Sequence, residues 1–275
     1  MADIKAADVA KLRKATGAGM MDCKKALIEA NGDFDHAVEE IRKKGQAIAN
    51  KRADRDATEG VVLAKTTTDN KNGAIVVLNC ETDFVAINED FISFATSILD
   101  KAIETKVSTL DELKEVELEG HKIGDLVAEK SGIIGEKIEL GGFASASSEM
   151  VIPYIHQGNK LATLVSFNKE IDAQVGRDVA MQVAAMSPVS VDKDNVPADV
   201  VAKELEIGRE QARLDGKPEA ILDKIAQGKL GKFYKENTLM NQIFVKDGKA
   251  TVATYLKGID AEIKVNSFER FSLNN

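Results

Sequence analysis

The pattern of apolar and polar positions changes abruptly around residue 79. The uninterrupted apolar run Ala74-Ile75-Val76-Val77-Leu78 predicts a buried strand, and Asn88-Glu89-Asp90-Phe91 is typical of a capped helix start. The short stretch between them, residues 79–86, mixes polar and apolar side chains without a period. We therefore expect an exposed corner that is tipped with the carboxylate of Asp83 and the phenyl ring of Phe84.

The order strand, turn, strand, helix occurs twice along the chain. The first unit has predicted strands at 60–65 and 74–78 and a helix near 89–104. The second has predicted strands at 150–156 and 161–167 and a helix near 170–186, and the alternating segment 261–267 adds a late strand. Because an isolated hairpin is marginally stable, each needs a helix or a third strand on its apolar face. The fold class that this predicts is α+β, with a core of two similar lobes, residues 60–142 and residues 143–187 with 237–275.

The first 45 residues favour three short helices. In the third, Phe34, Ala37, Val38 and Ile41 recur at the spacing of an amphipathic helix, and Gly45 is expected to end it. A core of this size is marginal on its own. Residues 46–59 are polar and charged and are interpreted as a linker.

Residues 188–236 interrupt the second lobe. Two amphipathic helical patterns flank the turn Gly216-Lys217-Pro218, which predicts an antiparallel helical hairpin. Its apolar stripe is thin and is broken by Gly208, Gly228 and Gly231. We therefore expect a protruding arm.

Composition narrows the function mainly by exclusion. The 275 residues carry a formal net charge of −8, which argues against a general binder of nucleic acid or of anionic membranes. No apolar run approaches the ~20 residues that span a bilayer, and the N-terminus has no leader pattern. Cys23 and Cys80 do not form a disulfide scaffold. We expect a cytoplasmic protein whose partner is another protein, without nucleic acid or membrane.

Two stretches carry a family resemblance. Asn79-Cys80-Glu81-Thr82-Asp83-Phe84-Val85-Ala86 closely resembles a signature of the bacterial elongation factor Ts family, and Thr16-Gly17-Ala18-Gly19-Met20-Met21-Asp22-Cys23-Lys24-Lys25-Ala26-Leu27 matches a second one without a gap. The resemblance extends over nearly the whole chain. It implies an N-terminal three-helix domain like the ubiquitin-associated fold (1–45), a linker (46–59), two lobes, and an inserted coiled coil (188–236).

The resemblance also implies a partner and a site. Members of this family are nucleotide exchange factors of the GTPase elongation factor Tu, which they bind in its GDP-bound and nucleotide-free states. Thr82, Asp83, Phe84 and Val85 would form a wedge that dislocates the partner's Mg²⁺. Further partner contacts would come from Met20, Met21, Cys80, Ile134, Gly135 and His156. The resemblance implies no catalytic residue, no cofactor and no metal held by this chain.

Two departures qualify this transfer. The family often has His-Gly-Gly-Gly where this chain has His156-Gln157-Gly158-Asn159, so the contact geometry of that turn is in doubt. The chain also stops at Asn275, whereas many relatives continue into a segment that packs on the GTPase.

Simpler interpretations stand beside these roles. The glycines and lysines of residues 16–27 lack the spacing of a phosphate loop. One of Met20 and Met21 is expected to serve the core, and the segment around Ile134 is equally a helix-to-strand connection. Without the resemblance, Asp83 is a turn or cap residue and Phe84 a core ring.

Enzyme chemistry has weak support. No HExxH or CxxC pairing is present. His36 is interpreted as a solvated residue on the polar side of the third helix, and His121 has no partner in view. A Cys80–His156 dyad and a Glu81–Asp83 acid/base pair remain as alternatives. A ubiquitin-associated-type adaptor without exchange activity is the competing binding hypothesis.

Overall fold

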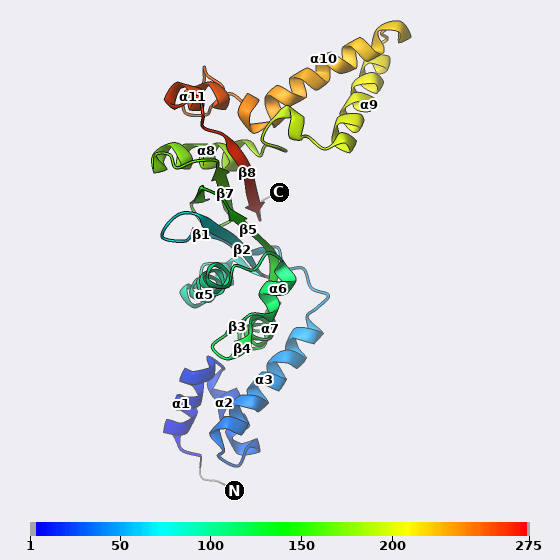
Figure 1. Ribbon diagram of the computed structural model, residues 1–275. Helices are drawn as coiled ribbons and strands as arrows, with labels where there is room; N and C mark the ends of the chain where they lie inside the picture. Colours follow the sequence, from blue (N-terminus) through cyan, green and yellow to red (C-terminus); the bar gives the residue numbers. More distant parts are fainter. Residues whose placement is uncertain (1–3, 274–275) are drawn as a thin grey trace.

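The computed structural model describes residues 4–273 and shows an elongated mixed α and β protein (Figure 1). A group of helices lies at one end, two sheets lie in the middle, and a helical arm projects at the other end. The expectations about a leader and about the end at Asn275 fall on residues 1–3 and 274–275, outside the described residues.

The N-terminal helices are α1 (Ala6–Thr16), α2 (Met20–Glu29) and α3 (Phe34–Lys51). They share a small core that includes Leu12, Leu27 and Ile41. The expectation that Gly45 ends the third helix was wrong, because α3 continues to Lys51, into the first part of the predicted linker. Gly45 is buried inside the helix, where a Cβ would lie 3.3 Å from the backbone of Glu129. The glycine therefore permits a close helix contact instead of a chain turn.

The first sheet is antiparallel, with the strand order β1 (Glu59–Thr66), β2 (Asn72–Cys80) and β5 (Glu139–Ser147). The predicted hairpin is confirmed, with Val62 opposite Val77. β5 was not predicted, and it pairs with β2 along its length across a bulge at Val77/Leu78. The predicted lobe boundary at residue 142 falls inside this strand.

The second sheet is also antiparallel, with the order β6 (Met150–Ile155), β7 (Leu161–Phe167) and β8 (Val265–Ser272). Its hairpin and the late third strand are confirmed, although β8 begins and ends later in the chain than predicted. Both repeats therefore build a three-stranded sheet.

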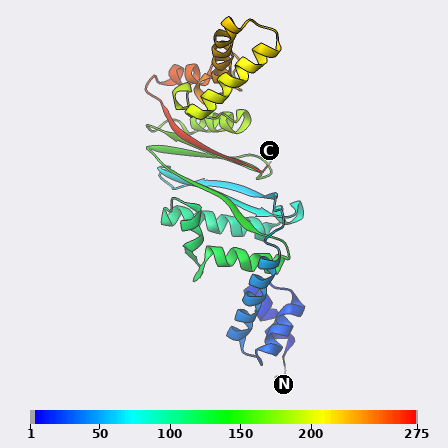
Figure 2. The same ribbon diagram turned by 90° about the vertical axis from the view of Figure 1, so that its right-hand side faces the viewer.

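The two sheets stack face to face, with helices on their outer sides (Figure 2). Alternate residues of β1, β2, β6 and β7 meet between the sheets: Val62, Ala64, Ile75, Val77, Val151, Ala162 and Leu164. The intervening residues of β2, such as Val76 and Leu78, face the helical side instead. The apolar run 74–78 is uninterrupted because both faces of this strand are buried.

Helices cover the two outer faces. On the first sheet lie α5 (Glu89–Thr105), α6 (Leu110–Glu115) and α7 (Ile123–Ile134), with a small ribbon of β3 (Glu117–Leu118) and β4 (His121–Lys122). On the second sheet lies α8 (Ala173–Met186), and α11 (Val252–Ile259) adds Val252 and Leu256 to the same core. The predicted helix start at Asn88 is confirmed by the side-chain cap from Asn88. The helix expected near residues 170–186 is present as α8, which begins at Ala173 after a side-chain cap from Asp172.

The arm consists of α9 (Ala198–Leu214) and α10 (Glu219–Asn237), preceded by a short 3₁₀ turn (Lys193–Asn195) and followed by another (Leu239–Asn241). The predicted helical hairpin is therefore confirmed. Gly208 allows the two helices to approach closely, since a Cβ there would lie 3.0 Å from the Cα of Ala226. The buried amide of Gln242 donates to the carbonyls of Met186 and Glu236 and fastens the base of the arm to α8.

Candidate functional site

The corner predicted between strand and helix is a one-turn helix, α4 (Asp83–Ala86), that follows the end of β2. Asp83 is exposed, Phe84 is 79% exposed, and Ile87 beyond it is 72% exposed. The interpretation of Phe84 as a core ring is therefore wrong. Leaving most of a phenyl ring exposed to water is unfavourable compared with burying it against a partner.

The backbone of the corner is bound by a carboxylate from elsewhere in the chain. Glu136 accepts hydrogen bonds from the amides of Glu81 (3.1 Å) and Thr82 (3.0 Å) and from the hydroxyl of Thr82 (2.7 Å). Thr82 occupies the N-cap position of α4, yet its side chain makes no cap and donates to Glu136 instead. Glu136 therefore fixes the residues from which Asp83 and Phe84 project.

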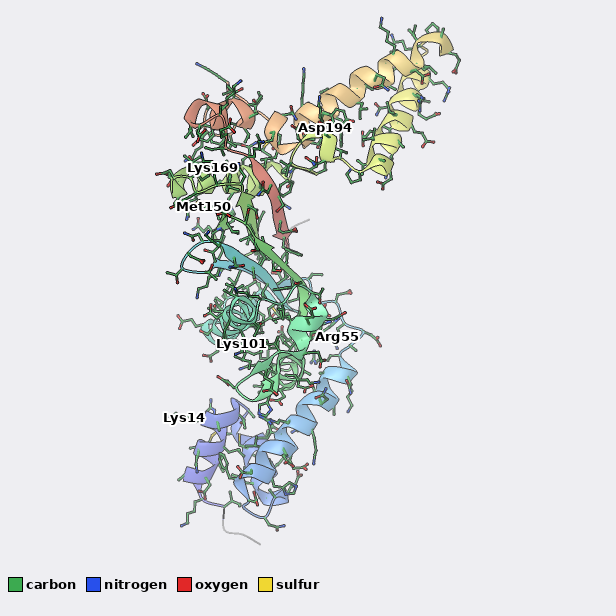
Figure 3. The ribbon with its side chains drawn as sticks, viewed as in Figure 1. Lys14, Arg55, Lys101, Met150, Lys169 and Asp194 are labelled. Atoms are coloured by element: carbon green, nitrogen blue, oxygen red, sulfur yellow. The ribbon has the colours of Figure 1, made fainter. Side chains whose placement is uncertain are left out.

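Glu81 returns the interaction. Its carboxylate accepts from the amide of Lys137 at 2.6 Å and pairs with Arg52 at 2.7 Å and with Arg55 at 3.7 Å. Arg55 lies on the segment between α3 and β1 (Figure 3). The Lys137 amide, followed by Arg52, holds the pKa of Glu81 below its ordinary value. Glu81 is thus a structural anion, which leaves Asp83 as the exposed carboxylate of the corner.

Cys80 does not have the properties of a nucleophile. Its thiol is buried and donates to the carbonyl of Thr82 at 3.1 Å. Burial, with the negative charge of Glu136 as the next cause, raises the pKa of Cys80 to about 12. His156 is exposed and its Nδ1 lies 2.9 Å from the hydroxyl of Tyr154. Cys80 and His156 therefore each bond to a different residue, and neither bond is the one that a Cys80–His156 dyad requires.

The predicted contacts on α2 are both at the surface. Met20 is 47% exposed and Met21 is 65% exposed, so the expectation that one serves the core was wrong. The core face of α2 is made by Cys23, Ala26 and Leu27 instead. Ile28 is 49% exposed and lies seven residues after Met21, on the same helix face. Ile28 was not among the predicted contacts, although its spacing from Met21 is visible in the sequence.

Ile134 and Gly135 lie at the end of α7. Ile134 is half-buried against the first core, and Gly135 ends the helix in a left-handed conformation with φ 81°. The helix-to-strand connection that we considered is therefore real. It also carries Glu136 to the corner, so the two interpretations of this segment describe the same loop.

A groove of about 680 Å³ lies between the corner, the end of α7 and the end of α1, and Met20 and Met21 are not among its lining residues. Phe84 and Val85 line it together with Ile133 and Ile134 of α7 and with Thr16 and Gly17 at the start of the α1–α2 turn. A single partner surface lying along this groove can therefore contact the N-terminal helices, the end of α7 and the corner together.

Charged side chains line the same groove. The guanidinium of Arg42 contacts His121 and lies 3.2 Å from Glu129, so His121 has a partner that the sequence did not suggest. Burial raises the pKa of Glu129, and the positive charge of Arg42 opposes this shift. These groups connect α3 with α7.

The turn of the second hairpin borders the corner. Lys160 pairs with Glu59 at 2.8 Å, and the carbonyl of Asn159 accepts from the amide of Val62 at 2.7 Å. The hydrogen bond to Glu59 raises the pKa of Lys160, and the charge of Asp83 adds to this shift. The turn is thus intact with Gln157 and Asn159 in it, and it lies within electrostatic range of Asp83.

The described residues carry two further negative findings. No group of three or more His, Cys, Asp and Glu side chains among residues 4–273 is arranged to hold a metal ion. Within the same range, every helix is either too short or too polar to cross a bilayer.

Comparison with known proteins gives a consistent result. A model of the family described as "Elongation factor TS" matches residues 81–275. The chain is 50% identical over 275 residues to elongation factor Ts of Christiangramia forsetii, covering 99% of this chain and 100% of that one. It is 52% identical over 270 residues to elongation factor Ts of Amoebophilus asiaticus, with 97% and 98% covered. For elongation factor Ts of Flavobacterium psychrophilum the identity is 48% over 275 residues, with 99% and 100% covered.

Proposed function

The chain belongs to the elongation factor Ts family, and from this premise we propose that it is a guanine nucleotide exchange factor for the GTPase elongation factor Tu in protein synthesis. It binds the GDP-bound GTPase, promotes the release of GDP, and remains on the nucleotide-free form until a new nucleotide displaces it. It acts in the cytoplasm and needs no cofactor, nucleic acid or membrane. It is not an enzyme in the sense of making or breaking covalent bonds.

The mechanism places Asp83 and Phe84 at the tip of a wedge. Phe84 enters an apolar gap of the GTPase and shifts the elements around it. Asp83 perturbs the water and side-chain shell that holds the partner's Mg²⁺, which is the largest local positive charge beside the GDP phosphates. Loss of the metal weakens the hold on the β-phosphate, and GDP leaves. Because binding linkage is reciprocal, nucleotide in turn displaces the factor.

One observation carries the proposal: Phe84 is 79% exposed on a corner whose backbone is bound in place. Burying a phenyl side chain contributes about 1.5–3 kcal/mol, and here that free energy is left for a partner. Thr82 and Val85 flank the tip, with Thr82 bound to Glu136 and Val85 packed on the first core. The tip is therefore presented by a pre-organised base.

The wedge needs support from other contacts. Driving a two-state equilibrium from one extreme to the other takes about 5.5 kcal/mol of differential binding, more than one ring and one carboxylate supply while also holding the complex. We assign the remaining binding to Met20 and Met21, to Ile134 and Gly135, and to His156. Cys80 acts indirectly, through its bond to the carbonyl of Thr82. The complex is expected to bury more than about 1,200 Å².

The architecture of the family completes the proposal. Residues 1–45 form the core of a ubiquitin-associated-like domain, 60–142 and 143–187 with 237–275 form the two lobes, and 188–236 form the inserted coiled coil. The continuation of α3 to Lys51 and the position of β5 across residue 142 support moving both of these boundaries a few residues later.

The test is the release of a fluorescent GDP analogue from elongation factor Tu in stopped flow, across a Mg²⁺ titration. The protein is compared with Asp83→Ala, Phe84→Ala and, as the matched control, Ile87→Ala, which removes an equally exposed apolar side chain three positions away. We expect Asp83→Ala and Phe84→Ala each to lose about tenfold or more of the acceleration while still binding the GTPase. Ile87→Ala should retain most of it.

The alternatives predict different results. If the unaltered protein binds elongation factor Tu equally well with and without GDP and leaves release unchanged, it is an adaptor and the exchange proposal fails. If Ile87→Ala loses as much as Phe84→Ala, general apolar contact rather than a specific wedge drives release.

A further inference from the structure

The corner and the loop after α7 are joined by reciprocal hydrogen bonds to the carboxylates of Glu136 and Glu81. Glu136 binds the amides of Glu81 and Thr82 and the hydroxyl of Thr82, while Glu81 binds the amide of Lys137. Each glutamate thus fixes the backbone next to the other. Hydrogen bonds with an ionised acceptor are about twice as strong as neutral ones, so this pair is a substantial local restraint.

Besides these two glutamates, the corner is held by the bond from the Cys80 thiol to the carbonyl of Thr82 and by the packing of Val85 and Ala86 on the first core. The pairing of β1 with β2 ends at Glu59 and Cys80. The next two amides, those of Glu81 and Thr82, donate to Glu136 instead of to a strand. α4 is a single turn of 4 residues, and a helix of that length has no independent stability. The bonds that reach residues 81 and 82 therefore fix the N-terminal end of this turn, from which the exposed side chains of Asp83 and Phe84 project.

Glu136 itself is held firmly. The hydroxyl of Ser131 in α7 accepts from the amide of Ile138 at 2.9 Å and donates to the carbonyl of Ile138 at 3.2 Å, so the loop 135–137 is closed over the helix end. Ser131 is buried. Arg52, the C-cap residue directly after α3, donates to the carboxylate of Glu81.

We propose that Glu136 is a positioning residue for nucleotide exchange: it sets the direction in which Asp83 and Phe84 leave the surface. Glu81 holds the loop of Glu136 through the amide of Lys137, and Arg52 in turn binds Glu81. This inference rests on the proposed function and assigns a role that neither Asp83 nor Phe84 performs. Glu136 acts through Thr82 and does not contact the nucleotide or the metal.

If Glu136 has this role, its removal should lower the maximal rate of GDP release more than it lowers the affinity for the GTPase. Glu136→Ala leaves both side chains of the tip present but free to reorient. The freely moving ring of Phe84 still contributes to binding of the GTPase. GDP release needs the ring and the carboxylate in a fixed geometry, so its rate falls. Glu136→Gln keeps one acceptor oxygen and so retains part of the restraint. Glu139→Ala is the matched control, since Glu139 lies three residues after Glu136, at the start of β5, and pairs with the ammonium of Lys137 at 3.0 Å without binding the corner.

The experiment has two readouts on the full chain. The first is backbone amide hydrogen exchange of residues 81–84 without any partner. The second is GDP release from elongation factor Tu as a function of factor concentration, which separates the maximal rate from the half-saturating concentration. Thermal unfolding of each variant confirms that it is folded.

We expect Glu136→Ala to speed amide exchange at residues 81–84 and to lower the maximal release rate about tenfold, while the half-saturating concentration changes less than about threefold. Glu136→Gln should lie between Glu136→Ala and the unaltered protein, and Glu139→Ala should match the unaltered protein. The proposal is overturned if Glu136→Ala releases GDP at the unaltered rate, if its loss is confined to affinity, or if amide exchange does not change. Failure of the proposed function is distinguishable, because then the unaltered protein does not speed release at all.

Discussion

Gly45 of α3 and Gly132 of α7 meet backbone to backbone, so closely that a Cβ on Gly132 would lie 2.1 Å from the Cα of Gly45. The salt bridge between Arg42 and Glu129, at 3.2 Å, flanks this contact. The N-terminal helices are therefore joined to the first lobe by a helix crossing that only glycine permits. The position of Met20 and Met21 relative to Phe84 depends on this crossing.

Gly132→Ala is expected to weaken the attachment of the N-terminal helices. Adding a methylene-sized group to a tightly packed contact costs about 1–3 kcal/mol, and here the neighbouring atoms are backbone and cannot rotate away. Chemical denaturation should show a lower unfolding free energy, and limited proteolysis should cut the segment between α3 and β1 faster. Unchanged stability would mean that the two helices can separate without cost.

Gly228→Ala and Gly231→Ala should have the opposite effect. Both glycines lie within α10, and a Cβ on either would meet nothing within 4 Å. Alanine in an open helical position stabilises a helix by about 0.5–1 kcal/mol relative to glycine. Denaturation of each variant should therefore give a higher unfolding free energy, and a decrease would show that these glycines serve a contact that the packing of the arm does not account for.

The two kinds of glycine explain one limit of the sequence analysis. Gly45 had the features of a helix end, because a glycine after an amphipathic stripe commonly ends a helix. What decided its role was Gly132, distant in the chain, and no local pattern carries that information. β5 was not predicted for a related reason. Gly141, Gly142 and the small residues of this strand give no clear apolar–polar alternation, and the strand forms because it pairs with the edge of β2.

Some residues of the candidate site could be predicted from local sequence and others could not. The corner was predictable, since an apolar run, a capped helix start and a signature surround it. Glu136 was not, because it is 55 positions from Glu81 in the chain and is an ordinary glutamate in its local context. Ile28 could have been found, because its spacing from Met21 is helical.

The burial of Cys80 predicts low reactivity. A thiol whose pKa is raised to about 12 carries almost no thiolate near neutral pH, and Cys80 is fully buried as well. Iodoacetamide at about pH 8, below the ordinary thiol pKa of ~8.5, should modify it far more slowly in the folded protein than in denaturant. Peptide mass analysis separates it from Cys23, which is also buried. Rapid modification of Cys80 in the native protein would contradict this and would reopen the enzyme hypothesis.

The exposed face of α2 predicts a defect in affinity. Met21→Ala and Ile28→Ala remove apolar area that the folded protein leaves in water, so each should leave the unfolding temperature unchanged. Each should raise the concentration of factor that half-saturates GDP release, by about three- to tenfold, because truncating an interface side chain commonly costs about 1 kcal/mol. Met186→Ala is the control, since Met186 is 44% exposed at the end of α8, outside the predicted contacts. An equal loss in all three would indicate a nonspecific effect.

Glu81 predicts a dependence of stability on pH. The amide of Lys137 and the guanidinium of Arg52 lower its pKa in the folded protein from the ordinary 4.5, so the unfolded chain binds a proton at a higher pH than the folded one. The stabilisation from Glu81 is therefore fully present above pH 4.5 and is lost as the pH falls through the lower folded value. Glu81→Gln should reduce the unfolding free energy by a constant amount near neutral pH, and the difference should shrink in acid.

Glu149→Gln is the control for this titration, because Glu149 makes an exposed pair with Lys71 at 3.2 Å and exposed pairs contribute little. Its unfolding free energy should follow that of the unaltered protein at every pH. A difference for Glu81→Gln that stays the same down to the acid limit would show that Glu81 is held by shape and not by charge. In that case the restraint that connects α3, the loop after α7 and the corner would not depend on the ionisation of Glu81, and the neutral carboxyl would still hold the amide of Lys137 better than glutamine does.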